Sequence, residues 1–201
     1  MSAGARLRLL AVVVSVTAVV PPAWAFDPAE TFKKGSYVLS LEGAYGEQFN
    51  LEGFHTVSDI KFFNVGFRSS ILPLGPTGSG FLTGALELGL EPVYQQYTDP
   101  KPAFWGGLAA VGRYHFLSLG RFVPYVELAG AAGGTDLRVR EIDSDFSFLL
   151  WGGVGASVFV TDSTAVSAGY RYEHNSNGNV KSPNRGWESH VGVLGVSYYF
   201  R

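Results

Sequence analysis

The chain has 201 residues, with 26 glycines, 15 Phe, 10 Tyr, 4 Trp and no cysteine. Without cysteine there are no disulfide scaffolds, thiolate zinc sites or cysteine nucleophiles, and a net charge of −2 excludes a basic surface for nucleic acid. Charged residues make up 16% of the chain, against about 25% in ordinary soluble domains. This composition suits a protein whose outer surface does not face water.

The first 25 residues have the three parts of a secretory signal peptide. Arg6 and Arg8 give a positive start, residues 9–20 are uncharged, and Ala23-Trp24-Ala25 forms an A-x-A cleavage site. An uncleaved anchor helix is the alternative, but the apolar run is shorter than the about 20 residues that span a bilayer. We therefore expect a cleaved signal peptide at 1–25, export of the chain, and one domain over 26–201.

The rest of the chain is typical of strands rather than helices. Residues 27–34 predict one short helix, with Asp27 as its cap and Pro28 at its first position. Beyond it, apolar and polar residues alternate with period 2 between clusters of Gly, Pro, Asn and Asp. The pattern predicts eight strands, near 36–46, 56–70, 80–97, 103–117, 122–134, 146–160, 164–175 and 187–200.

Each predicted strand has one apolar face and one face of small or charged residues. In the strand near 164–175, Tyr170 and Tyr172 share a face opposite Arg171 and Glu173. A soluble β-sandwich or lipocalin-like barrel could bury the apolar face, but the opposite face is not rich in Lys and Glu as a solvated surface would be. We therefore predict an all-β fold, an eight-stranded antiparallel transmembrane β-barrel with a short N-terminal helical segment, apolar residues outside and charges in the lumen.

Aromatic residues lie near the ends of the predicted strands, which is typical of the two girdles at membrane interfaces. The residues assigned to these girdles are Tyr37, Tyr45, Tyr97, Trp105, Trp151, Tyr170 and Tyr172.

Barrels in the outer membrane have short turns on the inner side and longer loops on the outer side, so loop lengths predict which end of the barrel faces outward. The connections at 70–79, 118–121 and 161–163 are short, whereas those near 47–55, 98–102, 135–145 and 176–186 are mostly longer and more polar. The loop at 136–145 contains four acids that could hold Ca²⁺, but no ligand spacing is visible and a solvated loop is favoured. These acids are Asp136, Glu141, Asp143 and Asp145.

Three polar residues are predicted to face outward among apolar neighbours. His174 and Ser176 are two positions apart in a strand, so they share a face at about 6.5–7 Å between Cα atoms, with the parity of Tyr172. Glu188, in the adjacent strand, has the parity of Leu194 and also faces outward. Ordinary polarity at the barrel rim could explain each one alone. Together they predict a triad with Ser as nucleophile, His as base and Glu as the group that orients His.

This segment resembles the PagL family of outer-membrane lipid A 3-O-deacylases. The family carries an H-x-S-N element in the penultimate strand, then N-x-G and a Glu that opens the last strand, and Glu188 follows His174 at the family's interval of 14 residues. Residues 112–116 and 124–128 agree more loosely. The matching positions are His174, Ser176, Asn177, Asn184, Gly186 and Glu188.

The resemblance implies a Ser/His/Glu triad on the lipid-facing side of an eight-stranded barrel. It also implies that Asn177, Asn184 or the amide of Gly178 contributes to an oxyanion hole. Lys181 and Arg185 flank the site and could contact phosphates of the substrate.

The predicted function is removal of the 3-O-linked acyl chain from lipid A in lipopolysaccharide, in the bacterial outer membrane, with no metal or other cofactor. Outer-membrane lipids surround the barrel, nucleic acid is not a partner, and a homodimer is left open. Two alternatives remain: a phospholipase or broader acyl esterase that uses the same triad, and a non-catalytic structural or adhesive barrel. The second alternative would leave the shared outward parity of the three polar residues unexplained.

Overall fold

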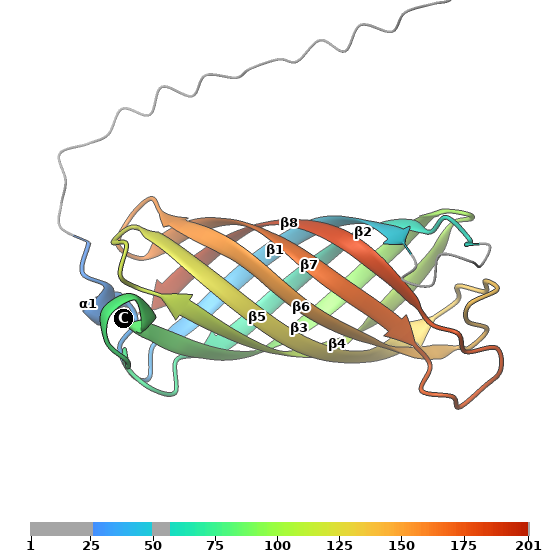
Figure 1. The fold of residues 1–201 in the computed structure, drawn as a ribbon, viewed down its shortest axis with the longest axis horizontal. Helices are drawn as coiled ribbons and strands as arrows, with labels where there is room; N and C mark the ends of the chain where they lie inside the picture. The colour runs from blue at the N-terminus through green and yellow to red at the C-terminus, as the bar shows by residue number, and fades with distance from the viewer. Residues whose placement is uncertain (1–25, 50–56, 201) are drawn as a thin grey trace, which may run out of the picture.

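The protein folds as a closed barrel of eight antiparallel strands, seen from the side in Figure 1. The computed structural model describes residues 26–49 and 57–200, so the predicted signal peptide lies outside the described residues. The strands are β1 (Tyr37–Phe49), β2 (Lys61–Ile71), β3 (Gly84–Asp99), β4 (Ala103–Phe116), β5 (Phe122–Thr135), β6 (Phe146–Phe159), β7 (Thr164–Ser176) and β8 (Trp187–Phe200). A short helix α1 (Pro28–Thr31) precedes them, and a 3₁₀ turn η1 (Gly80–Leu82) precedes β3.

Each strand pairs with its neighbour in the chain, and β8 pairs with β1 to close the barrel. Closure removes the unpaired strand edges that lipid does not tolerate. The eight predicted strands are confirmed with shifts of a few residues. The largest shifts are at the start of β2, which begins at Lys61 instead of near 56, and at the start of β3, where Gly80–Leu82 forms a 3₁₀ turn instead of extended chain.

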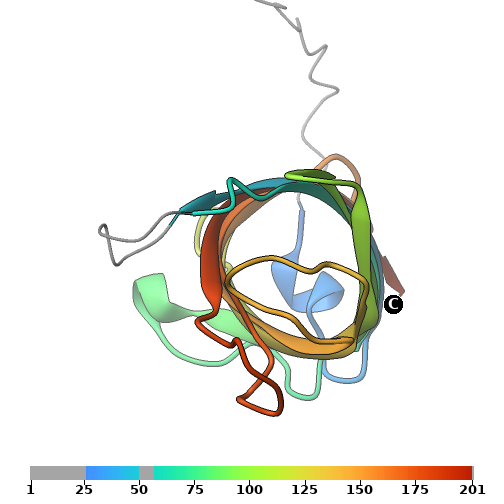
Figure 2. The same cartoon turned by 90° about the vertical axis from the view of Figure 1, so that its right-hand side faces the viewer.

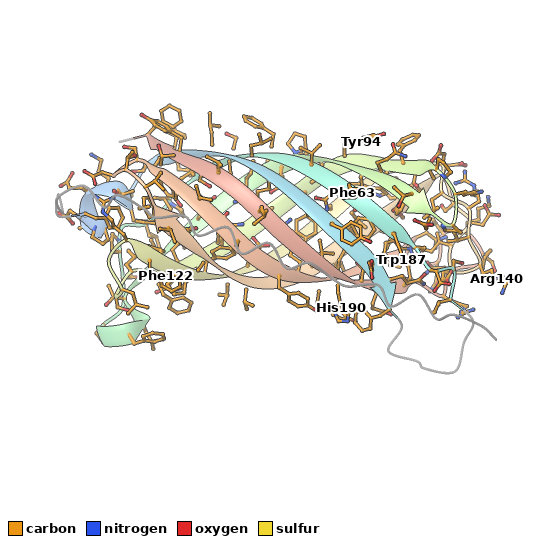
Figure 3. All side chains as sticks on the ribbon, turned by 90° about the horizontal axis from the view of Figure 1, so that it is seen from above. Phe63, Tyr94, Phe122, Arg140, Trp187 and His190 are labelled. Carbon is orange, nitrogen blue, oxygen red and sulfur yellow. The ribbon has the colours of Figure 1, made fainter. Side chains whose placement is uncertain are left out.

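The outer face of the barrel is mostly apolar, as the strand parities predict. Leucine, valine and aromatic side chains project from every strand, and Figure 3 shows Tyr94, Phe122 and His190 on the outer surface. An apolar band around a closed barrel is typical of a protein that lipid surrounds. No helix among the described residues is long and apolar enough to cross a membrane. Examples from the outer face are Leu41, Phe67, Leu90, Leu128, Val154 and Leu194.

The lumen holds a buried network of charges, also as predicted. Arg68 is fully buried and lies 2.9 Å from Glu42, 3.2 Å from Glu87 and 3.0 Å from Glu91. His115 is also buried in the lumen, with Nε2 2.7 Å from the Glu87 carboxylate. Each charge in this part of the network therefore has a partner of opposite sign or a hydrogen bond, which offsets the cost of burial.

A second part of this network joins two more guanidinium groups. Arg113 lies 2.8 Å from Glu42 and 2.6 Å from Glu127, and Arg171 forms ion pairs with the same two carboxylates. Gly153 faces the network from β6, and a Cβ there would lie 3.1 Å from carbons of both Arg171 and Glu127. Small inward residues thus make room for long charged side chains inside the narrow barrel.

The prediction that the strand-end aromatics all face lipid is wrong for three of them. Tyr97, Trp105 and Trp151 are buried in the lumen, where they pack with Phe62 and Trp187 in an apolar cluster. In β3, β4 and β6 their positions have the inward parity. An eight-stranded barrel has an interior that side chains fill, so large rings near one end serve as core.

Both ends of the lumen are closed. At one end α1 begins at Asp27, whose carboxylate accepts a hydrogen bond from Ala29 N at 2.9 Å, as predicted for a cap. Behind α1, Phe32 is buried, with its ring centroid 5.1 Å from that of Tyr199. At the other end the loop at 136–145 crosses the mouth, as Figure 2 shows, and its Leu137 and Ile142 are buried in the apolar cluster.

Candidate active site

His174 and Glu188 form a hydrogen-bonded pair on the outside of the barrel. They are direct partners in the antiparallel register of β7 and β8, and His174 Nδ1 lies 3.1 Å from Glu188 Oε1. The side chains are 34% and 20% exposed, so the pair sits partly sheltered at the surface. Because the carboxylate engages Nδ1, it fixes the orientation of the ring and leaves Nε2 for another partner.

Ser176 is the last residue of β7 and lies two positions beyond His174. Residues two apart in a strand share a face, and Phe148 is the partner of Ser176 in β6. Within the described part of the chain its hydroxyl has no hydrogen-bond partner, so the oxygen is available to an incoming group. The register therefore brings the three predicted triad residues to one outer face at the same end of two adjacent strands. Catalytic hydrogen bonds are often long or unformed without substrate.

Gly186 confines the imidazole of His174. A Cβ at this position would lie 2.8 Å from His174 Cε1, closer than real Cβ contacts allow, and the backbone φ is +69°. Glycine is the residue that adopts this left-handed conformation without strain. The loop backbone can therefore approach the edge of the ring closely, which limits how far the imidazole can swing.

The loop between β7 and β8 is held by the two asparagines of the predicted motif. Asn177 is fully buried, its backbone N–H donates to Asn184 Oδ1 at 2.7 Å, and its side-chain amide donates to the carbonyl of Lys181 at 2.7 Å. Asn184 Nδ2 donates to Asn179 Oδ1 at 2.9 Å. In this structure these amides shape the loop. By contrast, the N–H of Gly178 has no acceptor among the described residues.

Two basic residues lie on the same loop. Lys181 Nζ is 3.6 Å from Asp143 Oδ1, and both side chains are about half exposed. Arg185 is exposed, and its backbone N–H donates to the carbonyl of Glu141 at 2.8 Å. These contacts connect the loop between β7 and β8, which we call the triad loop, to the loop at 136–145 that covers the mouth of the barrel, which we call the mouth loop. The predicted contacts of Lys181 and Arg185 with substrate phosphates stay predictions.

The four acids of the loop at 136–145 all have partners within the chain; Glu141 is buried, whereas Asp136 and Asp145 are also exposed to solvent, as predicted for a solvated loop. Glu141 is fully buried and accepts hydrogen bonds from Ser58 N at 3.0 Å and Ser58 Oγ at 2.7 Å. Arg138 pairs with Asp143 at 3.0 Å and also with Asp145. Asp136 Oδ1 accepts a hydrogen bond from the backbone N–H of Phe104, in β4, at 2.6 Å. No group of three or more His, Asp or Glu side chains that could hold a metal occurs among residues 26–49 and 57–200.

An apolar groove leads away from His174 across the outer faces of β7, β6, β5 and β4. We call it the β6 groove; its volume is about 450 Å³. His174 and Tyr172 line the end of the groove nearest the loop between β7 and β8, and Gly152 and Gly130 form part of its floor. A Cβ at Gly152 would meet no atom within 4 Å, so the hollow exists because a side chain is missing there. The sequence analysis did not identify this groove, although the outward parity of both glycines could have indicated it.

His190 lies on the same outer face, one step along β8 from Glu188. Its Nδ1 is 2.5 Å from the hydroxyl of Tyr170, and its ring stacks on Phe49 with centroids 3.8 Å apart. Figure 3 places His190 at the outer surface near the end that carries the triad loop. The residue is therefore a partnered surface group at the level where polar and apolar parts of the outer face meet.

The chain was compared with protein families, curated proteins and solved structures. Residues 63–197 match the model of one family, described as lipid A 3-O-deacylase (PagL), and this range includes all six motif positions. No curated protein matches the chain.

The solved structures share the fold at low identity. The crystal structure of the outer membrane enzyme PagL matches with a TM-score of 0.58 and 18% identity, covering 78% of this chain and 97% of that one. Neisserial surface protein A (NspA) matches with a TM-score of 0.56 and 19% identity, covering 83% and 100%. Because these two fits are nearly equal, the fold alone does not separate an enzyme from a surface protein, whereas the family match spans two thirds of the sequence. The chain belongs to the PagL family of lipid A 3-O-deacylases.

Proposed function

We propose that this protein is an outer-membrane serine esterase that removes the 3-O-linked acyl chain of lipid A. The observation that carries the proposal is the His174–Glu188 pair at 3.1 Å on the lipid-facing side, two positions from a serine with an open hydroxyl. A buried or lumen-facing triad could not reach a lipid substrate. Membership of the family supplies the substrate class and the outer-membrane location, and residues 1–25 supply the export signal.

In the proposed reaction, Ser176 Oγ attacks the ester carbonyl carbon while His174 Nε2 takes its proton. Glu188, hydrogen-bonded to Nδ1, holds the ring and stabilises the imidazolium. The tetrahedral intermediate then collapses, the bond to the sugar oxygen breaks, and His174 returns the proton to that oxygen. Water, deprotonated by His174, hydrolyses the acyl-enzyme and releases the fatty acid and free Ser176.

The donor proposed for the oxyanion is the N–H of Gly178, which is unused among the described residues. Asn177 and Asn184 are proposed to support it indirectly, because their amides already bond within the loop. A preorganised donor is effective because it needs no rearrangement when charge develops on the oxygen.

The β6 groove is proposed to hold the chain that is cleaved. It starts at His174 and is lined mostly by apolar and small residues, as a hydrocarbon chain requires. Its position outside the barrel lets an acyl chain enter from the membrane without leaving a hydrophobic environment.

The substitution Ser176→Ala tests the proposal. Purified protein would be incubated with lipid A, and mass spectrometry would follow loss of one 3-hydroxyacyl chain. We expect turnover to fall by a factor of about 10⁴ or more, since removal of a nucleophile leaves only binding and oxyanion effects. Ser69→Ala is a matched control, because Ser69 is also an outward, exposed serine, on β2. Wild-type rates in the Ser176→Ala variant would refute the assignment.

The same assay separates the alternatives. A phospholipase with this triad would leave lipid A intact and release fatty acid from phospholipid vesicles. A non-catalytic barrel would do neither, and Ser176→Ala would then have no effect on either substrate. Lysates should also show whether the protein runs as a monomer or as the homodimer that the sequence leaves open.

A further inference from the structure

A second apolar groove lies on the other side of β7, which we call the β8 groove. It has a volume of about 670 Å³ and runs over the outer faces of β1, β2, β7 and β8. Gly43 and Gly192 form its floor, and Leu41, Tyr45, Phe63 and Leu194 are among its walls. A Cβ at either glycine would meet no atom within 4 Å, so this hollow also exists because two side chains are missing.

The β8 groove and the candidate active site lie along the same strand, β8. The outward positions of β8, in order, are Glu188, His190, Gly192 and Leu194. Successive outward positions are about 6.5–7 Å apart, so the floor of the groove begins two steps from the triad carboxylate. Gly192 is also the register partner of Tyr170 on β7, the strand that carries His174.

A polar row separates the triad level from the groove. His190 bonds to the Tyr170 hydroxyl at 2.5 Å, and its register partner on β1, Glu47, lies 3.7 Å from Lys61 Nζ. The Tyr45 hydroxyl donates to the same Glu47 carboxylate at 2.5 Å. Hydrogen-bonding groups at this level followed directly by an apolar hollow match a lipid whose polar linkage continues into a hydrocarbon chain.

We propose that the β8 groove holds a second acyl chain of the same substrate molecule, the amide-linked chain at position 2 of the sugar whose 3-O-ester is cleaved. This inference rests on the proposed function. Chains on neighbouring sugar carbons leave the sugar side by side. The β6 groove begins at His174, and the β8 groove begins at Gly192, two outward positions along β8 from Glu188, on the other side of β7. The β6 groove takes the chain that departs, the β8 groove takes the chain that stays, and the Tyr170–His190 pair meets the polar root of the retained chain.

Two glucosamine substrates test the proposal. Both carry the same 3-O-acyl ester, but one has a long acyl amide at position 2 and the other has an acetyl amide. Gly192→Leu places a side chain in the β8 groove, at a position where a Cβ meets no atom within 4 Å. We expect it to lower kcat/KM for the two-chain substrate about tenfold relative to the one-chain substrate, the size of effect that loss of apolar contacts gives. His190→Phe, which keeps the stack on Phe49, should raise KM for the two-chain substrate more than it lowers kcat.

Two glycine variants serve as comparisons. Gly152→Leu fills the β6 groove and should lower turnover of both substrates. Gly106→Leu is the matched control, because Gly106 has the outward parity of β4, has open space around its Cβ position and lines neither groove. Equal losses on both substrates for Gly192→Leu, or no loss at all, would overturn the proposal.

Binding separates this inference from the triad assignment. In the Ser176→Ala background, native mass spectrometry would measure retention of the two lipids. A further Gly192→Leu change should weaken binding of the two-chain lipid alone, whatever hydrolysis the wild-type protein shows. If wild-type protein releases no acyl chain but this binding difference appears, the proposed function fails and the β8 groove stands as a lipid site. If hydrolysis is found and the binding difference is absent, the triad stands and the groove assignment falls.

Discussion

The imidazole of His174 is fixed on two sides, by a hydrogen bond and by a missing side chain. Glu188 holds Nδ1 at 3.1 Å, while Gly186 brings the loop backbone against the ring edge. Gly186→Ala would place a methyl group 2.8 Å from His174 Cε1 and displace the ring. A misplacement of about 1 Å can cost a factor of about 10² in rate. We therefore expect kcat for lipid A deacylation to fall about 100-fold while the variant still folds.

A backbone effect must be separated from this steric one. Gly120 has a similar φ, +63° against +69°, but a Cβ there meets nothing within 4 Å and the residue lies in a turn at the α1 end. Gly120→Ala should therefore lose about 1–3 kcal/mol of stability from the left-handed backbone and keep its activity. If Gly120→Ala and Gly186→Ala lowered kcat equally, contact with His174 would not be the cause.

At the scale of whole strands, the grooves on the outer face form where glycines interrupt the row of apolar side chains. Gly152→Leu would place a side chain in the β6 groove, at a position where a Cβ meets no atom within 4 Å. We expect kcat/KM for a long-chain ester to fall at least tenfold, with a smaller loss for an acetyl or butanoyl ester of the same sugar, because only the long chain needs the groove. Released fatty acids measured by mass spectrometry would give both rates. A uniform loss for long and short chains would show that the groove does not bind the chain.

The strands, and the outward placement of the three proposed triad residues, follow from the sequence because both depend on local period. Alternation over β7 and β8 determines that His174, Ser176 and Glu188 share the outward face, and the register then pairs His174 with Glu188. The lumen charges, such as Arg113, are predicted by the same parity. Period alone therefore predicts that the three residues share the outward face, whereas the pairing of His174 with Glu188 depends on the register.

Other features depend on contacts between strands that are distant in sequence. Trp105 and Trp151 fill the end of the lumen near the loop at 136–145, because the narrow barrel closes around them. Their positions near strand ends in the sequence do not show this. Glu141 is buried because the mouth loop folds back over the barrel and meets Ser58, 83 residues away. The two grooves likewise need outward glycines on several strands to come side by side, which only the register determines.

At the scale of the molecule, the contacts that stabilise the barrel lie inside it, and the residues proposed for catalysis lie on its outer surface. The β-sheet that forms the barrel wall separates the two. Ion pairs and aromatic rings fill the lumen, α1 and the mouth loop close its ends, and the proposed triad stands outside. The wall between them is a single sheet, so a change in the lumen alters the stability of the barrel before it alters the outer surface.

Arg68→Met tests this separation. The guanidinium of Arg68 contacts Glu42, Glu87 and Glu91, and it is the ion-pair partner of Glu91 among the described residues. Removal leaves a buried carboxylate uncompensated, which costs about 3–5 kcal/mol. We expect the urea midpoint for unfolding from vesicles to fall accordingly, and kcat at temperatures well below unfolding to stay within about twofold of wild type, since the fold and the outer face persist.

Two further variants give this prediction its controls. Arg68→Met combined with Glu91→Gln should recover part of the lost stability, because the unpaired charge is removed together with its partner. Lys33→Ala breaks an exposed pair with Glu30, 3.9 Å apart, and should change stability by less than about 1 kcal/mol. If Arg68→Met abolished deacylation in barrels that are still folded, well below the urea midpoint, the lumen would take part in the chemistry. The barrel wall would then not separate stability from catalysis.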